Sequence, residues 1–217
     1  IMEHVFDEAW IRQKQFKYAM ENEVIYQPTG EIAHKVIDNQ LPGFIKGATA
    51  EDTNKFILDI GCGDGYAMEK MIEMGYENVQ GLTLHKQEWD QCKEKELVVH
   101  LMNYNFSTMM DRFFHVIWMR QSLQYSFQPY YTMLELNRVM RINGWVYIEV
   151  PDTSNQGVPL GTLHSETYER LFKAAGFEII QSDSIELSAG DISEKHNFYA
   201  LVKRMNVNLP ALPEEDE

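Results

Sequence analysis

The chain has 217 residues, of which 44% are hydrophobic and 24% are charged, a composition typical of one globular domain with a sizeable core. Its net charge of −14 disfavours nucleic acids and anionic membrane surfaces, which leaves a small molecule or a protein as partner. No apolar run is long enough to span a membrane, and no secretory leader is visible. The two cysteines make no disulfide framework and no Cys/His cluster has zinc spacing, so we expect a cytoplasmic protein without a metal.

The first fifty residues are predicted to form two helices and a loop ahead of the main fold. Apolar residues recur among charged ones over residues 2–22, as in an amphipathic helix. Thr29 is predicted to cap a second helix that extends to Asp38. Residues 41–54 contain one proline and two glycines, so we expect them to be mostly loop.

The most informative stretch, residues 56–70, reads as a strand, a glycine-rich loop and a helix. Residues 56–58 are an apolar run that predicts a buried strand, and Asp59 follows it. Three glycines then alternate with other residues at positions 61, 63 and 65, and a helical pattern begins at Tyr66. This order opens many nucleotide-binding α/β folds, in which the glycines allow a sharp turn and a close approach of the ligand to the main chain.

The loop carries two carboxylates, and they indicate which ligand it binds. Asp59 stands at the strand end and Asp64 lies inside the loop, which suits a cationic ligand better than a pyrophosphate. The third glycine of the dinucleotide fingerprint is replaced by Tyr66, and no Lys-Ser/Thr pair follows the last glycine. A nicotinamide-dependent oxidoreductase and a P-loop protein are therefore disfavoured.

The rest of the chain alternates apolar strands with amphipathic helices, as expected for an α/β sheet. Residues 142–144 are predicted to turn the chain, and residues 188–194 are predicted to be a turn-rich insertion near its end. The predicted strands cover residues 78–83, 97–102, 112–119, 145–150, 176–180 and 196–204, and the predicted helices cover residues 86–95, 130–140 and 166–175.

Two blocks of this sequence resemble class I S-adenosylmethionine-dependent methyltransferases, in particular the small-molecule enzymes of the type 11 and type 12 kind. Asp59-x-Gly61-x-Gly63-x-Gly65 after an apolar strand resembles the first motif of that family. The block from Glu135 to Pro151 resembles its Glu-x-x-Arg-Val-Leu-Lys-Pro-Gly-Gly run. The resemblance covers roughly residues 25–204. It implies a Rossmann-like α/β fold with a seven-stranded, mostly parallel sheet of order 3-2-1-4-5-7-6, in which the last strand is antiparallel.

The resemblance also implies a division of the chain and a set of cofactor-binding residues. Residues 1–54 would form a lid of helices and residues 55–204 the domain that binds S-adenosylmethionine, whose product is S-adenosylhomocysteine. The composition of residues 205–217 predicts an acidic, solvated tail. Thr83, assisted by Gln87 or Glu88, would face the ribose, and Asn103 would face the adenine. The complete set of implied contacts is Tyr26, Asp59, Gly61, Cys62, Gly63, Gly65, Thr83, Leu84, Gln87, Asn103 and Met119.

Several positions depart from the family pattern. Thr83 and Asn103 each stand where many members carry an acid, and His115 replaces the acid of a Phe-Asp-x-Ile segment. Gln124 and Tyr125 replace the last two residues of a Leu-Glu-His segment. The last three departures are expected at the wall between cofactor and substrate.

The implied reaction is methyl transfer to an oxygen or nitrogen of a small-molecule acceptor. His164, Asp152 and Tyr125 are, in that order, the candidates for a general base. Arg120 either binds an acidic group of the substrate or forms a surface salt bridge. Two alternative functions remain: a cofactor-binding protein that has lost transfer, and a lipid-modifying enzyme similar to cyclopropane-fatty-acid synthases, which share the run Gly81-Leu82-Thr83-Leu84.

Overall fold

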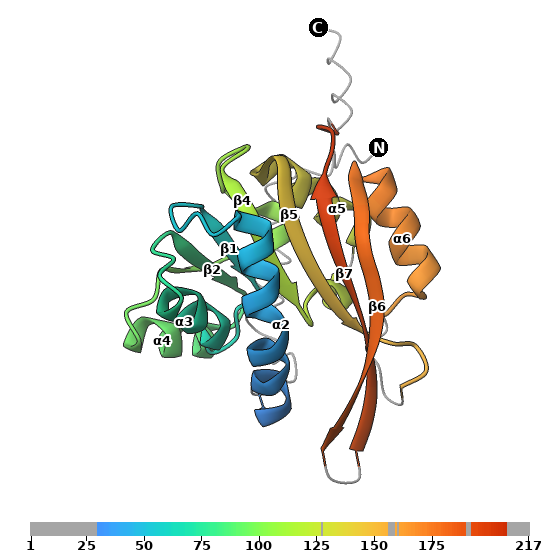
Figure 1. The fold of residues 1–217 in the computed structure, drawn as a ribbon, viewed down its shortest axis with the longest axis horizontal. Coiled ribbons are helices and arrows are strands. Elements are labelled where there is room, and N and C mark those ends of the chain that lie inside the picture. Colours follow the sequence, from blue (N-terminus) through green and yellow to red (C-terminus); the bar gives the residue numbers. More distant parts are fainter. Residues whose placement is uncertain (1–29, 127, 156–158, 160, 190–191, 208–217) are drawn as a thin grey trace, which may run out of the picture.

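The computed structural model describes residues 30–126, 128–155, 159, 161–189 and 192–207 (Figure 1). A single seven-stranded sheet with the order β3-β2-β1-β4-β5-β7-β6 forms its centre. The five strands β1 to β5 run parallel, and β7 is antiparallel to both β5 and β6. The predicted fold class and strand order are confirmed. The strands are β1 (Ile57–Ile60), β2 (Val79–Thr83), β3 (Val99–Leu101), β4 (Phe114–Arg120), β5 (Met140–Pro151), β6 (Phe177–Ala189) and β7 (Ile192–Lys203).

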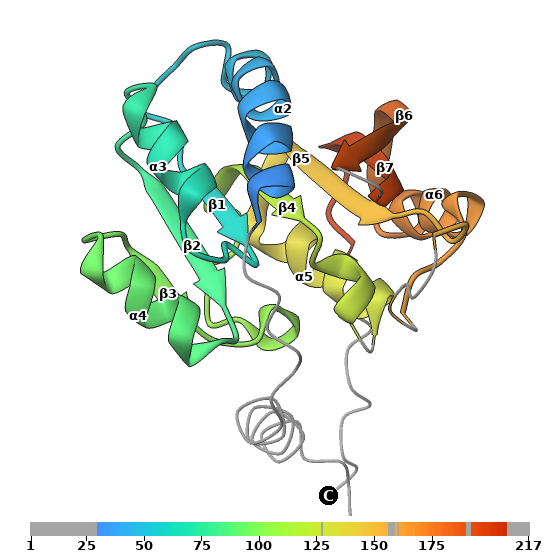
Figure 2. The ribbon, with the colours of Figure 1, turned by 90° about the horizontal axis from the view of Figure 1, so that it is seen from below.

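Helices cover both faces of this sheet (Figure 2), and each face has its own apolar core. One core lies under α2 (Glu31–Thr49), α3 (Tyr66–Glu73) and α4 (Lys86–Glu94), where Trp118 stacks on Tyr147 with ring centroids 3.9 Å apart. The other lies under α5 (Pro129–Val139) and α6 (Ser165–Ala174). Two short 3-10 helices, η1 (Tyr104–Phe106) and η2 (Leu123–Tyr125), follow β3 and β4.

The prediction for residues 29–54 was partly wrong: residues 31–38 are helical as expected, but the helix does not end there. One continuous helix, α2, extends from Glu31 to Thr49 with Pro42 inside it, and its N-cap is Gly30 and not Thr29. Leu41 and Ile45 are completely buried, and this burial offsets the hydrogen bond that a proline removes from a helix. The lid expected over residues 1–54 stays a prediction, because residues 1–29 lie outside the described residues.

Two further predictions were wrong because tertiary pairing overrides local turn signals. The segment Arg141–Gly144 does not separate α5 from a strand but forms a bulge inside β5, where the register to β4 shifts. The described residues of the segment 188–194 belong to strands and not to an irregular insertion, since Leu187 pairs with Glu194 and Ala189 with Ile192. The β6–β7 hairpin is therefore long, and its outer part extends beyond the carboxyl ends of the parallel strands (Figure 1).

Strands β5, β6 and β7 are longer than predicted, and the other predicted strands and helices that follow the glycine loop differ from the structure by at most two residues at their ends. Among the described residues, no helix combines the length and the apolar character that crossing a membrane requires. The same part of the chain contains no group of three His, Cys, Asp or Glu side chains arranged to hold a metal ion.

Candidate functional site

The candidate site lies at the carboxyl edge of the sheet, where the parallel strands end and ligands bind in open α/β sheets. Asp59 near the end of β1, Thr83 at the end of β2 and Arg120 at the end of β4 meet there. His196 joins them from the start of β7, because this antiparallel strand pairs His196 with Pro151 at the end of β5.

The glycine loop between β1 and α3 has a backbone that only glycine adopts without strain. Gly61, Gly63 and Gly65 have φ angles of 72°, 54° and 84°, all in the left-handed region. A Cβ atom at Gly61 would lie 1.9 Å from the Ser122 hydroxyl oxygen, and one at Gly65 would lie 2.4 Å from a methyl carbon of Leu97. Gly61 and Gly65 are thus required by the packing of the loop against the protein itself, in addition to any ligand.

Asp59 is the least satisfied charged group of the site. It is only 2% exposed, and its Oδ2 atom has no hydrogen-bond partner among the described residues. Burial raises its pKa to about 8, the carboxylates of Asp64 and Glu88 add to this, and the Arg120 guanidinium opposes it. A cationic ligand group beside Asp59 would supply the missing partner and restore the negative charge.

Asp64 connects the glycine loop to α2. It accepts a hydrogen bond from the backbone N–H of Tyr66 at 3.1 Å, and its other oxygen lies 3.5 Å from His34 Nε2. The His34 ring stacks on the Tyr66 ring with centroids 3.8 Å apart, and the Tyr66 hydroxyl donates to Asp38 at 2.9 Å. The N-terminal part of α2 is therefore held over the loop, at the carboxyl edge.

The end of β2 presents a carboxylate that does not come from the strand. The Thr83 hydroxyl donates to Glu88 Oε2 and accepts from the backbone N–H of His85 at 3.1 Å. Thr83 is buried and its hydroxyl is used internally, while Glu88, in the first turn of α4, is only partly buried. Sequence reasoning placed Glu88 only as an assistant to Thr83; the structure brings its carboxylate to the position after β2.

The two asparagines after β3 have different environments. Asn103 is half-buried and caps η1, with its side-chain oxygen accepting from the Asn105 backbone N–H at 2.9 Å. The side chain of Asn105 is buried and accepts from the Thr132 hydroxyl. Of the two, Asn103 is the one that lies at the surface of the site.

The other predicted cofactor contacts are placed as follows. Cys62 is buried in the loop, and Leu84 is half-buried after β2. Gln87 is exposed on α4. The Met119 side chain is completely buried in the core under α5, so it does not line the site. Tyr26 lies outside the described residues.

A buried polar cluster, formed by Arg120, Gln121, Glu149 and His196, continues the site across β4, β5 and β7. Glu149 is 1% exposed and accepts from Arg120 Nε at 3.0 Å and from Gln121 Nε2 at 3.3 Å. The His196 Nδ1 atom lies 2.8 Å from Glu149 Oε1, and Nε2 lies 3.1 Å from Glu194. Burial alone would raise the pKa of Glu149, but the hydrogen bond from His196 and the charge of Arg120 lower it. Because a carboxylate only accepts, we assign the Nδ1 proton of His196 to this pair.

Gln124 extends this polar cluster. It is 2% exposed, and its Nε2 donates to Gln121 Oε1 at 3.0 Å. Its Oε1 atom has no hydrogen-bond partner among the described residues, as for Asp59 Oδ2. A ligand donor at this place would satisfy it.

The three base candidates named from sequence lie on the same edge but in weaker settings. Asp152 has a pKa lowered to about 2 by hydrogen bonds from Ser154 and Asn197 and by Lys195. His164 is exposed at the N-terminus of α6, with Nδ1 3.1 Å from the Thr153 hydroxyl. Tyr125 is 52% exposed, and partial burial raises its pKa, so the phenol keeps its proton at neutral pH.

His115 is far from this edge, and the expectation that it forms a wall between cofactor and substrate was wrong. It lies near the start of β4, at the opposite, amino edge of the sheet, and its Nδ1 accepts from the Phe56 backbone N–H at 3.1 Å. The sequence pattern located His115 on the correct strand but assigned it to the wrong end of that strand.

Comparison with known proteins agrees with the geometry of the carboxyl edge. Residues 58–148, from β1 into β5, match the family model of the methyltransferase domain. This match and the shared fold support a class I methyltransferase of the type 11 kind. S-adenosylmethionine is the cofactor of such an enzyme. No curated protein matches the sequence.

Solved structures share the fold of this methyltransferase at low sequence identity. The methyltransferase in a Haloferax volcanii complex with the activator Trm112 is 16% identical, with a TM-score of 0.65 over 92% of this chain and 100% of that chain. The [4+2]-cyclase SpnF is 17% identical, with a TM-score of 0.65 over 85% of each chain. Geranyl diphosphate C-methyltransferase of Streptomyces coelicolor, solved with S-adenosylhomocysteine, is 12% identical, with a TM-score of 0.62 over 82% of this chain and 84% of that chain.

Proposed function

We propose that this methyltransferase transfers the methyl group of S-adenosylmethionine to an oxygen or nitrogen of a small, polar acceptor. The observation that carries the proposal is the buried polar cluster of Arg120, Gln121, Glu149 and His196 beside Asp59. An acceptor that docks there meets hydrogen-bonding groups and a guanidinium at the same edge as the glycine loop. A methyl-accepting molecule that carries an acidic group beside its oxygen or nitrogen suits these partners, because Arg120 can bind the acidic group.

The residues of the carboxyl edge fit the cofactor, whose sulfonium supplies an activated methyl group. The unpartnered Oδ2 of Asp59 suits a cationic amino group, and the glycine loop leaves main-chain atoms accessible at Gly61, which is exposed. We propose that the Glu88 carboxylate, held by Thr83, accepts hydrogen bonds from the ribose hydroxyls. Asn103 faces the adenine in this arrangement. Orientation of donor and acceptor, with exclusion of water, then accounts for much of the acceleration.

For an acceptor that loses a proton, the geometry favours His196 over the candidates named from sequence. Glu149 fixes its ring and its Nδ1 proton. Nε2 faces the Glu194 carboxylate and donates to it, so Nε2 accepts a proton from the methyl acceptor only in the neutral ring, when the half-exposed Glu194 side chain turns away. Asp152 is a weak base at neutral pH because its pKa is lowered to about 2. His164, Asp152 and Tyr125 remain lower-ranked proposals.

The alternatives make different use of the same edge. A lipid-modifying enzyme needs an apolar acceptor channel, whereas the groups beside Asp59 are polar and charged. A protein that has lost transfer would keep the cofactor contacts alone. SpnF, named as a [4+2]-cyclase, has this fold, so the fold by itself does not choose between these outcomes.

The decisive experiment combines calorimetry with a transfer assay on the full chain. S-adenosylhomocysteine should bind to the wild type, and labelled S-adenosylmethionine should transfer its methyl to members of a panel of phenolic acids, amino acids and amines. Replacement of His196 by Gln should lower kcat by about 10²-fold while S-adenosylhomocysteine binding stays unchanged. Cofactor binding without transfer to any polar acceptor would support the alternative of a protein that has lost transfer, and transfer only to unsaturated acyl chains would support the lipid enzyme.

A further inference from the structure

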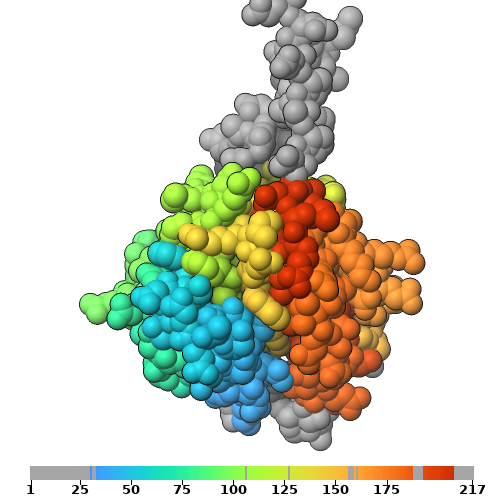
Figure 3. Space-filling view, turned by 45° about the horizontal axis from the view of Figure 1, so that its top comes forward, coloured from blue at the N-terminus to red at the C-terminus, as the bar shows by residue number. Residues whose placement is uncertain are grey.

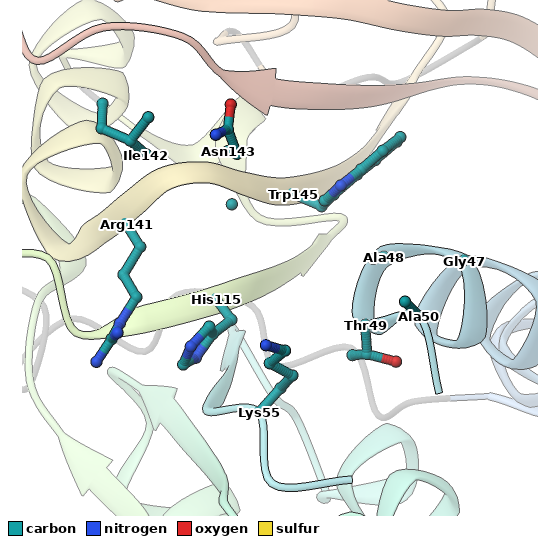
Figure 4. A pocket seen from close by; sticks show the side chains of 11 residues that line it. Gly47, Ala48, Thr49, Ala50, Lys55, His115, Arg141, Ile142, Asn143 and Trp145 are labelled. Atoms are coloured by element: carbon teal, nitrogen blue, oxygen red, sulfur yellow. The ribbon is translucent and has the colours of Figure 1, made fainter. Parts of the chain in front are cut away.

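A second pocket lies at the amino edge of the sheet, on the side opposite to the glycine loop. Its volume is about 420 Å³, within the size range of small-molecule sites (Figure 4). The walls are formed by the C-terminal end of α2, by Lys55 two residues before β1, by the start of β4 and by the bulge of β5. These segments gather on the face shown in Figure 3. The lining side chains used below are Lys55, His115, Arg141, Ile142 and Trp145.

Basic side chains are concentrated in this pocket although the chain as a whole carries a net charge of −14. Lys55, His115 and Arg141 lie in one row in Figure 4. His115 Nδ1 accepts from Phe56, so the neutral ring carries its proton on Nε2 as a donor. Arg141 donates through Nε to the Phe113 carbonyl at 3.2 Å, and its terminal nitrogens have no hydrogen-bond partner among the described residues. Arg141 and His115 thus keep donors for which no acceptor is found among the described residues, whereas Lys55 is paired with Asp52.

Two of the three charges that act on His115 are positive. Burial lowers the pKa of His115, and the charges of Arg141 and Lys55 lower it further. The opposing charge is Asp52, whose carboxylate lies 3.1 Å from Lys55 Nζ. An anion in the pocket would interact favourably with all three basic groups.

The pocket has a fixed shape and an apolar wall. A Cβ atom at Gly144 would lie 2.9 Å from the His115 carbonyl oxygen, so the bulge packs closely on β4. Asn143 is tied to Arg204 at the end of β7 by a hydrogen bond of 3.2 Å. Ile142 and the partly buried Trp145 supply apolar surface next to the basic row.

We propose that this amino-edge pocket binds a small organic anion, a carboxylate or a phosphate monoester that carries a flat apolar group. The anionic group pairs with Arg141, Lys55 and the Nε2 proton of His115, and the apolar group lies against Trp145 and Ile142. The site is separate from the carboxyl edge, so its occupation does not depend on the proposed function.

The test is calorimetry on the full chain with phenyl phosphate, saturated with S-adenosylhomocysteine to fill the cofactor site. Phenyl phosphate should bind more tightly than inorganic phosphate, and phenol should not bind measurably. Arg141→Ala should weaken phenyl phosphate binding at least about fivefold, because it removes charged hydrogen bonds. Asp52→Asn, which removes the opposing charge but keeps an oxygen acceptor for Asn54, should strengthen binding by about twofold.

Both substitutions lie on exposed residues, so the fold should persist, and a thermal melt together with an unchanged S-adenosylhomocysteine affinity checks this. Failure of phenyl phosphate to bind to the wild type would overturn the proposal. So would equal affinity in Arg141→Ala, which would place the ligand elsewhere, or equal affinity for phenol, which would show an apolar pocket without anion recognition.

Discussion

Asp59 at the carboxyl edge of the sheet and Lys203 at the amino edge are both buried ionisable side chains, and they differ in how they are satisfied. Lys203 is 0% exposed, and its Nζ donates to the backbone carbonyls of Asn137 and Met140, the latter at 2.9 Å. Asp59 is buried to almost the same extent, but one of its oxygens has no partner among the described residues. The lysine is thus satisfied by the end of α5 and serves the fold, whereas the aspartate lacks a partner that a bound cationic group would supply.

The two groups also give opposite pH dependence to the free energy of unfolding. The pKa of Asp59 is raised from 3.8 to about 8, so the folded state binds one more proton than the unfolded state between these values, and stability falls as pH rises. The pKa of Lys203 is lowered from 10.5 to about 8 by burial and by Arg112, so the unfolded state binds the extra proton and stability rises with pH across that window. Substitutions of Asp59 and of Lys203 should therefore change the pH dependence of the free energy of unfolding in opposite directions, and only the substitution of Asp59 should affect cofactor binding.

The largest effect is expected at Gly61. Replacement by Ala places a Cβ atom 1.9 Å from the Ser122 hydroxyl oxygen, at a φ of 72°. Ser122 cannot move freely, because its hydroxyl donates to the carbonyls of Ile60 and Arg120. We expect Gly61→Ala to lose about 2–5 kcal/mol of stability and measurable S-adenosylhomocysteine binding, as judged by urea unfolding and calorimetry.

Gly43 provides the matched control for this substitution. It lies inside α2, and a Cβ atom there would meet nothing within 4 Å. Gly43→Ala should increase stability by about 0.5–1 kcal/mol and leave binding unchanged. A Gly61→Ala protein that binds as tightly as the wild type would show that the loop tolerates a side chain, contrary to the packing described above.

Asp59→Asn should weaken S-adenosylhomocysteine binding by about 10²-fold, since it removes the charge that pairs with the cationic amino group. It should also stabilise the ligand-free protein at pH 8 by about 2 kcal/mol or more, because the unfolded wild type gains a freely ionised carboxylate there, whereas the folded wild type ionises the same carboxyl only half. Urea unfolding at pH 5 and pH 8 tests this: the wild type should lose stability between the two values, and the variant should lose less. A variant that is both less stable and less able to bind would mean that Asp59 is a structural residue.

Lys203→Met should have the opposite profile. It leaves two buried carbonyls without a donor and should cost about 1–3 kcal/mol at pH 7, while S-adenosylhomocysteine binding should change less than twofold. Urea unfolding and calorimetry on the same samples measure both. Loss of cofactor affinity in the folded variant would show that the two edges are coupled and that the distinction between them fails.

The sequence was most informative at the glycine loop, where the residues that shape the backbone are also the residues expected to contact the ligand. The run from Asp59 to Gly65 predicted the strand, the loop and the carboxyl-edge site, because closely spaced glycines permit the positive φ angles of a tight loop and the acid marks the strand end. The Glu149–His196 pair could not be found in this way, since its members are 47 residues apart and meet only through the antiparallel pairing of β5 and β7. The only available signal was the predicted antiparallel closing strand, which places residue 196 at the ligand edge.

Errors arose where tertiary packing decides between local alternatives. Pro42 and two glycines indicated a loop, but burial of Leu41 and Ile45 on the sheet extends α2 through them. Asn143 and Gly144 indicated a turn, and the structure uses them as a bulge that still pairs with neighbouring strands. The local pattern of apolar and polar residues contains no information on contacts between segments that are distant in the sequence.

The smallest expected effect is a difference in cofactor affinity between substitutions of Gln87 and Glu88 on α4. It tests which of the two contacts the ribose at the carboxyl edge. Glu88→Gln keeps an oxygen that Thr83 can donate to, but it removes the charge and one acceptor for the ribose, so S-adenosylhomocysteine binding should weaken about fivefold. Gln87→Ala should leave the affinity unchanged, because Gln87 is exposed and Glu88 lies beside Thr83. If Gln87→Ala weakens binding and Glu88→Gln does not, the sequence-based assignment of Gln87 to the ribose is correct. The Glu88 carboxylate then acts only by raising the pKa of Asp59.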